Sequence, residues 1–131
     1  MQSTYDKIQF YKLGQKQKDK IILQLKKSLA KEKNIKLAVI FGSLTTRKSI
    51  RDIDLAVYTA PTLTFNELLN LNAQLELDLA KPVDLVELRN LSATLQTNIL
   101  KNGTLIKGQK TLLRQLLNQM QTETANPRMP P

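Results

Sequence analysis

Apolar residues recur along the chain with two spacings, one typical of helices and the other typical of strands. Between Ile21 and Leu29 they recur every three or four positions among lysines and glutamines. This spacing predicts an amphipathic helix over residues 16–33 with one buried stripe. The short apolar run of residues 37–41 then suits a strand that is buried on both faces.

A second strand is indicated by strict alternation between Asp52 and Val57, where every second residue is Ile, Leu or Val. Pro61 ends this strand. Two further short apolar segments, Val83–Leu88 and Thr104–Lys107, are the remaining strand candidates.

Residues 65–80 give conflicting signals. Apolar and polar residues alternate there with a period of two, as in a strand. However, no β-branched residue occurs in this segment, and Thr64 with Glu67 forms the signature of a helix capping box. Because propensity and capping agree, we predict a helix.

Two later helices complete the pattern, one over residues 90–102 closed by Gly103 and one with its apolar face between Leu112 and Met120. Helices and strands in this order predict an α/β or α+β fold, with one mixed sheet flanked by helices. We predict a basic N-terminal segment at residues 1–15, a single domain at 16–121 and a disordered tail at 122–131.

Composition narrows the possible chemistry. The 131 residues include no cysteine and no histidine, which excludes disulfides, thiolate catalysis and zinc sites that need sulfur or imidazole. Chemistry based on carboxylates and a hard metal cation remains possible. No apolar run has the length of a signal peptide or a membrane span, so we expect a cytoplasmic protein.

The formal net charge of +9 is concentrated at the start of the chain, where residues 1–36 hold ten lysines against three acidic residues. A lysine-rich helix face exposed to water is the ordinary explanation. Nucleic acid, an acidic protein or nucleotide phosphates are the alternative partners.

The candidate site lies where strands begin and end. Gly42 follows a buried strand and permits close approach of a phosphate, while Ser43 offers a hydroxyl and an amide. Asp52 and Asp54 are two residues apart in a strand, so their Cβ atoms lie on one face, roughly 6 to 7 Å apart. A glycine turn and two exposed acids are the structural alternatives.

Asp84 is a third carboxylate from a different strand, opposite in direction to the apolar Val83 and Leu85. If its strand neighbours that of Asp52, three acids converge and Mg²⁺ is the natural ion to hold them. Simple exposure to water is the other interpretation.

Together these residues resemble the nucleotidyltransferase superfamily that includes DNA polymerase beta. The resemblance covers residues 37–107 and rests on Phe41-Gly-Ser, an eight-residue spacer, Asp52-Ile-Asp-Leu-Ala-Val57 and Val83-Asp-Leu-Val-Glu-Leu88. The similarity is greatest to the minimal nucleotidyltransferases (MNT), many of which are antitoxins paired with HEPN-domain toxins. The spacer is shorter than is usual in the family and contains no glycine.

The resemblance implies that Asp52, Asp54 and Asp84 hold Mg²⁺, two ions in all, and that Asp84 also activates the acceptor hydroxyl. Gly42 and Ser43 would hold the phosphates of ATP. It is compatible with contacts from Arg47, Lys48 and Arg51 to the triphosphate, although these three are equally well explained as exposed loop charges.

The function that follows is transfer of AMP from ATP to a hydroxyl of a HEPN-domain toxin, with this chain as the antitoxin. An inactive antitoxin that neutralises its partner by binding is one alternative. Nucleotidylation of a small molecule, as in aminoglycoside-modifying relatives, is another. Direct RNA binding by the lysine-rich half is a third, although the sequence lacks clustered aromatic residues.

Overall fold

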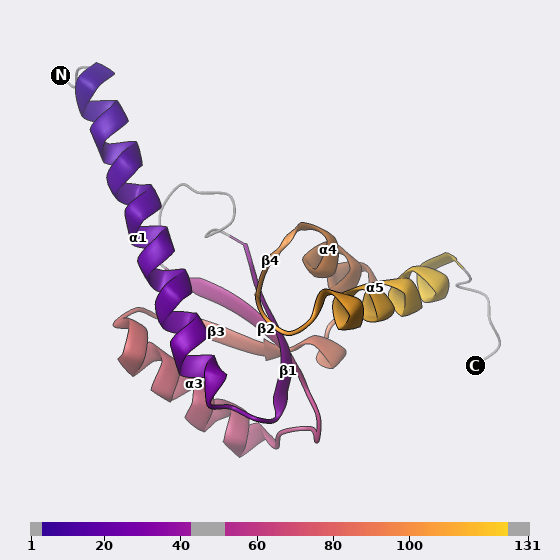
Figure 1. Cartoon of the computed structure of the whole chain (residues 1–131). Helices are drawn as coiled ribbons and strands as arrows, with labels where there is room; N and C mark the ends of the chain where they lie inside the picture. Colours follow the sequence, from indigo (N-terminus) through magenta and orange to yellow (C-terminus); the bar gives the residue numbers. More distant parts are fainter. Residues whose placement is uncertain (1–3, 43–51, 126–131) are drawn as a thin grey trace.

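The computed structural model describes residues 4–42 and 52–125, and the side chains of residues 14–42 and 52–121. Helices and strands follow one another in a mixed order, as the sequence predicts (Figure 1). The elements are α1 (Thr4–Ala30), β1 (Ile35–Phe41), β2 (Ile53–Thr59), α3 (Phe65–Leu79), β3 (Val83–Glu87), the 3-10 turn η1 (Leu88–Asn90), α4 (Ala93–Asn102), β4 (Thr104–Lys107) and α5 (Lys110–Ala125).

The four described strands form one mixed sheet in the order β3-β2-β1-β4. β1 is antiparallel to both of its neighbours, whereas β2 and β3 are parallel and are connected through α3. The predicted α+β class with a mixed sheet flanked by helices is therefore confirmed.

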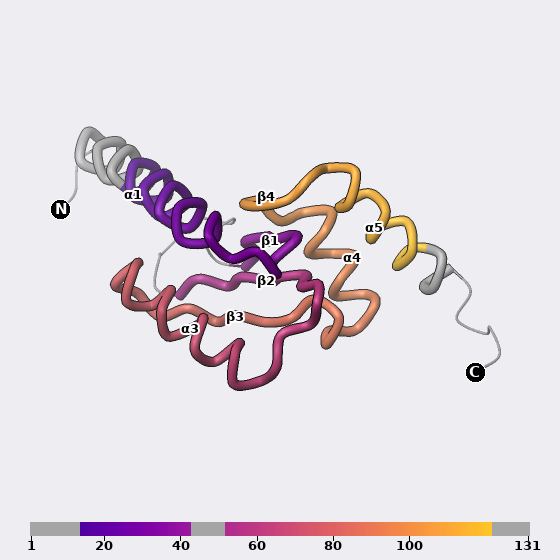
Figure 2. Tube along the Cα trace, turned by 60° about the horizontal axis from the view of Figure 1, so that its bottom comes forward, coloured from indigo at the N-terminus to yellow at the C-terminus, as the bar shows by residue number. Residues whose placement is uncertain are grey.

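Two helix pairs cover the two faces of the sheet (Figure 2). α1 and α3 bury residues such as Leu25 and Leu75 against one face. α4 and α5 bury Ile99, Leu100 and Leu116 against the other. Each face thus has its own apolar core, which is why the central strands have few polar positions.

The helix predicted against the period-two pattern is confirmed as α3. Thr64 caps it by accepting a hydrogen bond from the backbone N–H of Glu67, whose side chain accepts one from Thr64 in return. Helical geometry splits the alternating leucines between two sides. Leu71 and Leu75 are buried, while Leu69 and Leu77 are 54% and 77% exposed.

The other helix boundaries differ from those predicted. α1 begins at Thr4 rather than near residue 16, and it projects well beyond the sheet (Figure 1). α4 begins at Ala93, not at residue 90, because the side chain of Ser92 accepts a hydrogen bond from the N–H of Leu95 and caps the helix. α5 continues to Ala125, into the segment 122–131 for which a disordered tail is predicted.

A lysine from the edge strand β4 fixes the end of α1. Lys107 Nζ donates hydrogen bonds of 2.7 and 2.6 Å to the backbone carbonyls of Leu29 and Glu32. The same carbonyls also accept hydrogen bonds from the backbone N–H groups of Glu32 and Ile35, and a cation is favourable at a helix C-terminus. Among the described helices, none combines the length and the apolar character needed to cross a bilayer.

Candidate active site

The candidate site begins at Gly42, which directly follows β1. Its φ of 77° lies in the left-handed region, which glycine adopts without strain. Close packing imposes a second restriction, because a Cβ atom built on residue 42 would overlap with Oδ2 of Asp54. Gly42 is therefore required both for the turn and for the space that the Asp54 carboxylate occupies.

Asp54 and Asp84 are direct neighbours in the parallel ladder between β2 and β3. On its other side Asp54 pairs with Phe41, the last residue of β1. The three strands thus bring Gly42, Asp54 and Asp84 to one end of the sheet, and Asp52 lies just before β2. The strand of Asp84 thus neighbours the strand of Asp52–Val57, which was the condition for the three acids to converge.

The face that carries the acids follows from alternation along the strands. Ala56 and Val86 pack in the core under α4 and α5, and side chains two residues apart share a face. Asp54 and Asp84 therefore lie on the α4–α5 face. α4 packs against β1 on this face, and β1 pairs with β2 through Phe41 and Asp54.

The three carboxylates influence one another electrostatically. Burial raises the pKa of Asp54, and the negative charges of Asp84 and then Asp52 raise it further. Asp52 and Asp84 are exposed. A cation among these carboxylates would relieve both the desolvation and the repulsion.

The donors are of the right kind for Mg²⁺, which prefers carboxylate oxygens. In the described part of the chain, however, no three acidic side chains close on a common point as a metal site would. The backbone therefore brings the acids to one edge without bringing their oxygens together.

Four of the predicted site residues lie outside the described part of the chain: Ser43, Arg47, Lys48 and Arg51. Their segment joins Gly42 to Asp52, and both of these residues lie at the acidic end of the sheet. The roles expected for the four side chains remain predictions.

A cavity of about 380 Å³ lies on the β1 side of the acids, between the end of that strand and α4. Phe41 and Gly42 form one wall, and Leu95, Asn98 and Asn102 line it from α4. These α4 residues are not among those predicted from the sequence. Their spacing of three and four places them on one face of a helix, but only the sheet order shows that this face lies beside Gly42.

A second cavity, of about 760 Å³, lies on the β3 side and extends along α3. Asp84 lines it together with exposed apolar side chains, of which Phe65 and Leu69 are 65% and 54% exposed. β3 is an edge strand, but the side chains of Glu76 and Asn72 accept hydrogen bonds from the N–H groups of Val83 and Leu85. These two edge positions are thus unavailable to an added strand.

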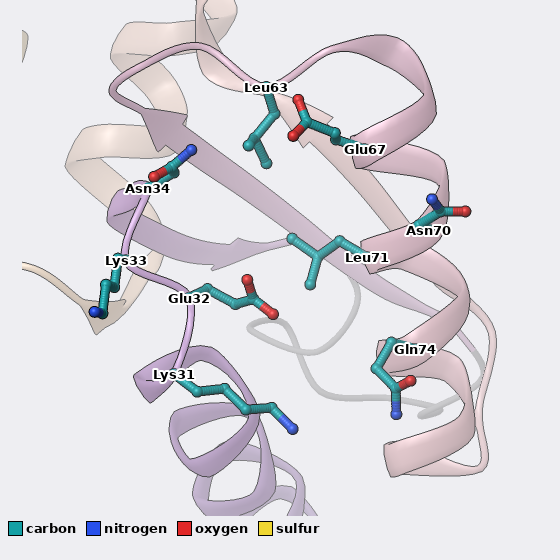
Figure 3. A pocket seen from close by; sticks show the side chains of 9 residues that line it. All are labelled: Lys31, Glu32, Lys33, Asn34, Leu63, Glu67, Asn70, Leu71 and Gln74. Carbon is teal, nitrogen blue, oxygen red and sulfur yellow. The ribbon is translucent and has the colours of Figure 1, made fainter.

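A third cavity lies at the opposite end of the sheet, where the end of α1 meets α3 (Figure 3). Figure 3 shows Lys31 and Glu32 directed towards Leu71 and Gln74 of α3. The neighbouring Asn34 accepts a hydrogen bond from the N–H of Ala60, just beyond β2. None of the candidate site residues lines this cavity.

The chain matches the family of polymerase beta nucleotidyltransferases over residues 23–112, and it belongs to that family. The region matched contains β1 to β4 and all of the acids discussed above. No curated protein shows significant sequence similarity.

Among solved structures, the fold is similar to antitoxin structures of the MNT type. A toxin–antitoxin structure with AMP-PNP is 26% identical, covers 80% of this chain and 87% of that one, and has a TM-score of 0.69. The tri-AMPylated HEPN toxin of Shewanella oneidensis with its MNT antitoxin gives 26% identity, 86% and 87% coverage and a TM-score of 0.64. A third match, at 25% identity, 83% and 87% coverage and TM-score 0.67, is a variant MntA toxin–antitoxin complex with two aspartates, two positions apart, replaced by glutamate.

Proposed function

We propose that this protein is a Mg²⁺-dependent adenylyltransferase that transfers AMP from ATP to a hydroxyl group of a HEPN-domain toxin, and so acts as its antitoxin. The observation that carries the proposal is the pairing of Asp54 with Asp84 beside Gly42. Family membership and the AMPylated toxin in a similar complex support the reaction type and the partner. A cytoplasmic location remains part of the proposal.

Each residue has a role that suits its position. Backbone amides at Gly42 and Ser43 would hold the triphosphate, and Asp52 and Asp54 would hold Mg²⁺. Two bound ions would supply charge neutralisation at the attacking and leaving oxygens. In the similar complex with two altered aspartates, the two positions have the same spacing as Asp52 and Asp54, which supports a functional role for this pair.

In the transfer itself, the acceptor hydroxyl oxygen forms a bond to the α-phosphorus, and the bond from that phosphorus to pyrophosphate breaks. Asp84 takes the hydroxyl proton. Its exposed carboxylate, on the edge strand β3, lines the cavity at that edge of the sheet, through which an acceptor reaches it.

The lining of the cavity beside Asp84 favours a protein over an aminoglycoside as the acceptor. The cavity beside Asp84 is lined mostly by apolar side chains, and Phe65 and Leu69 remain largely exposed at its rim. Exposed apolar surface of this kind marks sites of protein contact. A polycationic aminoglycoside would need acidic lining instead, so the small-molecule alternative is less well supported.

Two non-enzymatic alternatives make different predictions. An antitoxin that neutralises by binding alone would protect against the toxin even with Asp52→Ala or Asp54→Ala. A chain that binds RNA through its lysines would show salt-dependent RNA affinity and no labelling of protein.

The test is incubation of the HEPN-domain partner with this protein, Mg²⁺ and ATP labelled at the α-phosphate. We expect label on the partner, and we expect none with Asp54→Ala. Full neutralisation of the toxin without any label would contradict the proposal.

A further inference from the structure

The cavity between β1 and α4 adjoins the candidate phosphate-binding turn without belonging to it. It is lined by Gly42 and by Phe41, the ladder partner of Asp54. A nucleotide with its phosphates at Gly42 therefore has this cavity beside it. This inference rests on the proposed function, because it requires that ATP binds at that turn.

Strand order separates the two cavities that flank the acids. Asp84 lies on β3 at one edge of the sheet, and the apolar cavity along α3 opens beside it. The smaller cavity lies on the other side, against β1 and α4. If the acceptor approaches Asp84 from the β3 edge, the nucleoside is left with the β1 and α4 side.

The lining of the smaller cavity suits a nucleobase. Leu95 is 39% exposed and offers an apolar surface to a planar ring. Asn102 Nδ2 donates a hydrogen bond of 2.5 Å to Oδ1 of Asn98, which aligns the two amides along α4. This leaves N–H groups of Asn98 and the carbonyl oxygen of Asn102 for a ligand, and asparagine amides pair well with the N6 and N7 atoms of adenine.

The wall that carries these amides is held firmly. A Cβ atom on Gly103 would lie 2.7 Å from the carbonyl oxygens of both Ile40 and Ile99, so the end of α4 packs directly on β1. The cavity volume of about 380 Å³ lies within the range of small-ligand sites.

We propose that this cavity binds the nucleoside of the bound nucleotide, and that the amides of Asn98 and Asn102 select its base. On its N7 edge adenine offers these amides a donor and an acceptor, N6–H and N7, whereas the same edge of guanine offers two acceptors, O6 and N7. Both residues therefore determine which nucleotide is used and take no part in the transfer step.

The experiment is calorimetric titration of the protein with Mg²⁺ and one of three probes: ATP, GTP or inorganic tripolyphosphate. The variants are Asn98→Ala and Asn102→Ala, with Asn66→Ala as a matched control, because Asn66 is an exposed asparagine on the distant helix α3. Asn98 and Asn102 are also exposed, so all three variants are expected to fold.

We expect the two α4 variants to weaken ATP binding about 10-fold and to reduce the preference for ATP over GTP, the scale of losing a paired contact to a base. Tripolyphosphate binding and the Asn66→Ala control should be unchanged. Wild-type ATP affinity and base preference in both α4 variants would overturn this inference but leave the proposed function intact. Failure of the wild type to bind either ATP or tripolyphosphate would overturn both.

Discussion

Gly42 packs directly against the carboxylate of Asp54, with no room for a side chain at position 42. The turn after β1 and the central acid of the site are therefore parts of one arrangement. Asp54 in turn lies beside Asp84 in the β2–β3 ladder. A change at Gly42 is consequently expected to disturb the acids as well as the turn.

Gly42→Ala is expected to abolish binding of ATP and Mg²⁺. The new Cβ would displace the Asp54 carboxylate, and a φ of 77° strains any residue other than glycine by about 1 kcal/mol or more. Calorimetric titration and thermal unfolding measure the two effects. Gly14→Ala is the matched control: no atom lies within 4 Å of its Cβ position, and alanine stabilises a helix by about 1 kcal/mol over glycine. Unchanged ATP affinity in Gly42→Ala would contradict the assignment.

Asp54→Asn is expected to separate stability from function. Burial and the charges of Asp84 and Asp52 raise the pKa of Asp54, so its ionised form is unfavourable in the fold. Neutral asparagine should therefore raise the melting temperature in EDTA. It should also lower AMP transfer by at least about 100-fold, the scale of losing a group that stabilises transition-state charge.

Asp78→Asn provides the control for Asp54→Asn. The hydroxyl of Ser28 donates a 2.7 Å hydrogen bond to Asp78, and hydrogen bonds from Ser28 and Gln74 lower the pKa of this carboxyl. Its replacement should lower the melting temperature and preserve activity. Equal thermal shifts in the two variants would refute the electrostatic interpretation.

Leu69→Ser is expected to weaken AMP transfer to the toxin without changing ATP affinity, because Leu69 lines the cavity that contains Asp84. Leu77→Ser is the matched control on the same helix. Leu77 is 77% exposed and does not line that cavity. Both variants should unfold like the wild type. A larger loss of transfer with Leu77→Ser than with Leu69→Ser would contradict this assignment and would place the acceptor surface elsewhere on α3.

Glu87 is expected to make the protein less stable as pH rises. Burial raises its pKa above 4.5, despite hydrogen bonds from Thr59 and Arg89 that act in the opposite direction. The folded state thus binds the proton more tightly than the unfolded state. Its contribution is fully favourable below the unfolded pKa and declines as pH rises through the folded pKa.

Urea unfolding of the wild type and of Glu87→Gln between pH 3.5 and 7 measures this contribution. The range extends from about 1 unit below to about 3 units above the ordinary pKa of glutamate. The stability of the wild type relative to the variant should fall across that range. Parallel profiles would show that Glu87 has an ordinary pKa in the fold.

The sequence was sufficient for the sheet elements and for the acids. β2 alternates clearly, and Asp54 and Asp84 interrupt the apolar first halves of β2 and β3. The helix α3 was found because its capping box overrides a misleading alternation of leucines. Local rules are reliable where propensity, capping and pattern agree.

Features that depend on tertiary packing were not predictable in the same way. The start of α1 was missed because the segment before residue 16 carries no apolar stripe continuous with Ile21. Nothing local places Asn98 and Asn102 beside Gly42; that contact follows from α4 packing on β1. Likewise, the close fit of Gly42 and Asp54 depends on the antiparallel register between β1 and β2.

The most direct test of the central claim is transfer from α-labelled ATP to the purified HEPN-domain partner, comparing the wild type with Asp84→Asn. Asp84 is exposed, so the variant is expected to fold. We predict label on the partner, with a mass increase of whole AMP units, for the wild type only. Equal labelling by Asp84→Asn, or neutralisation of the toxin by the wild type with no AMP attached, would contradict the account.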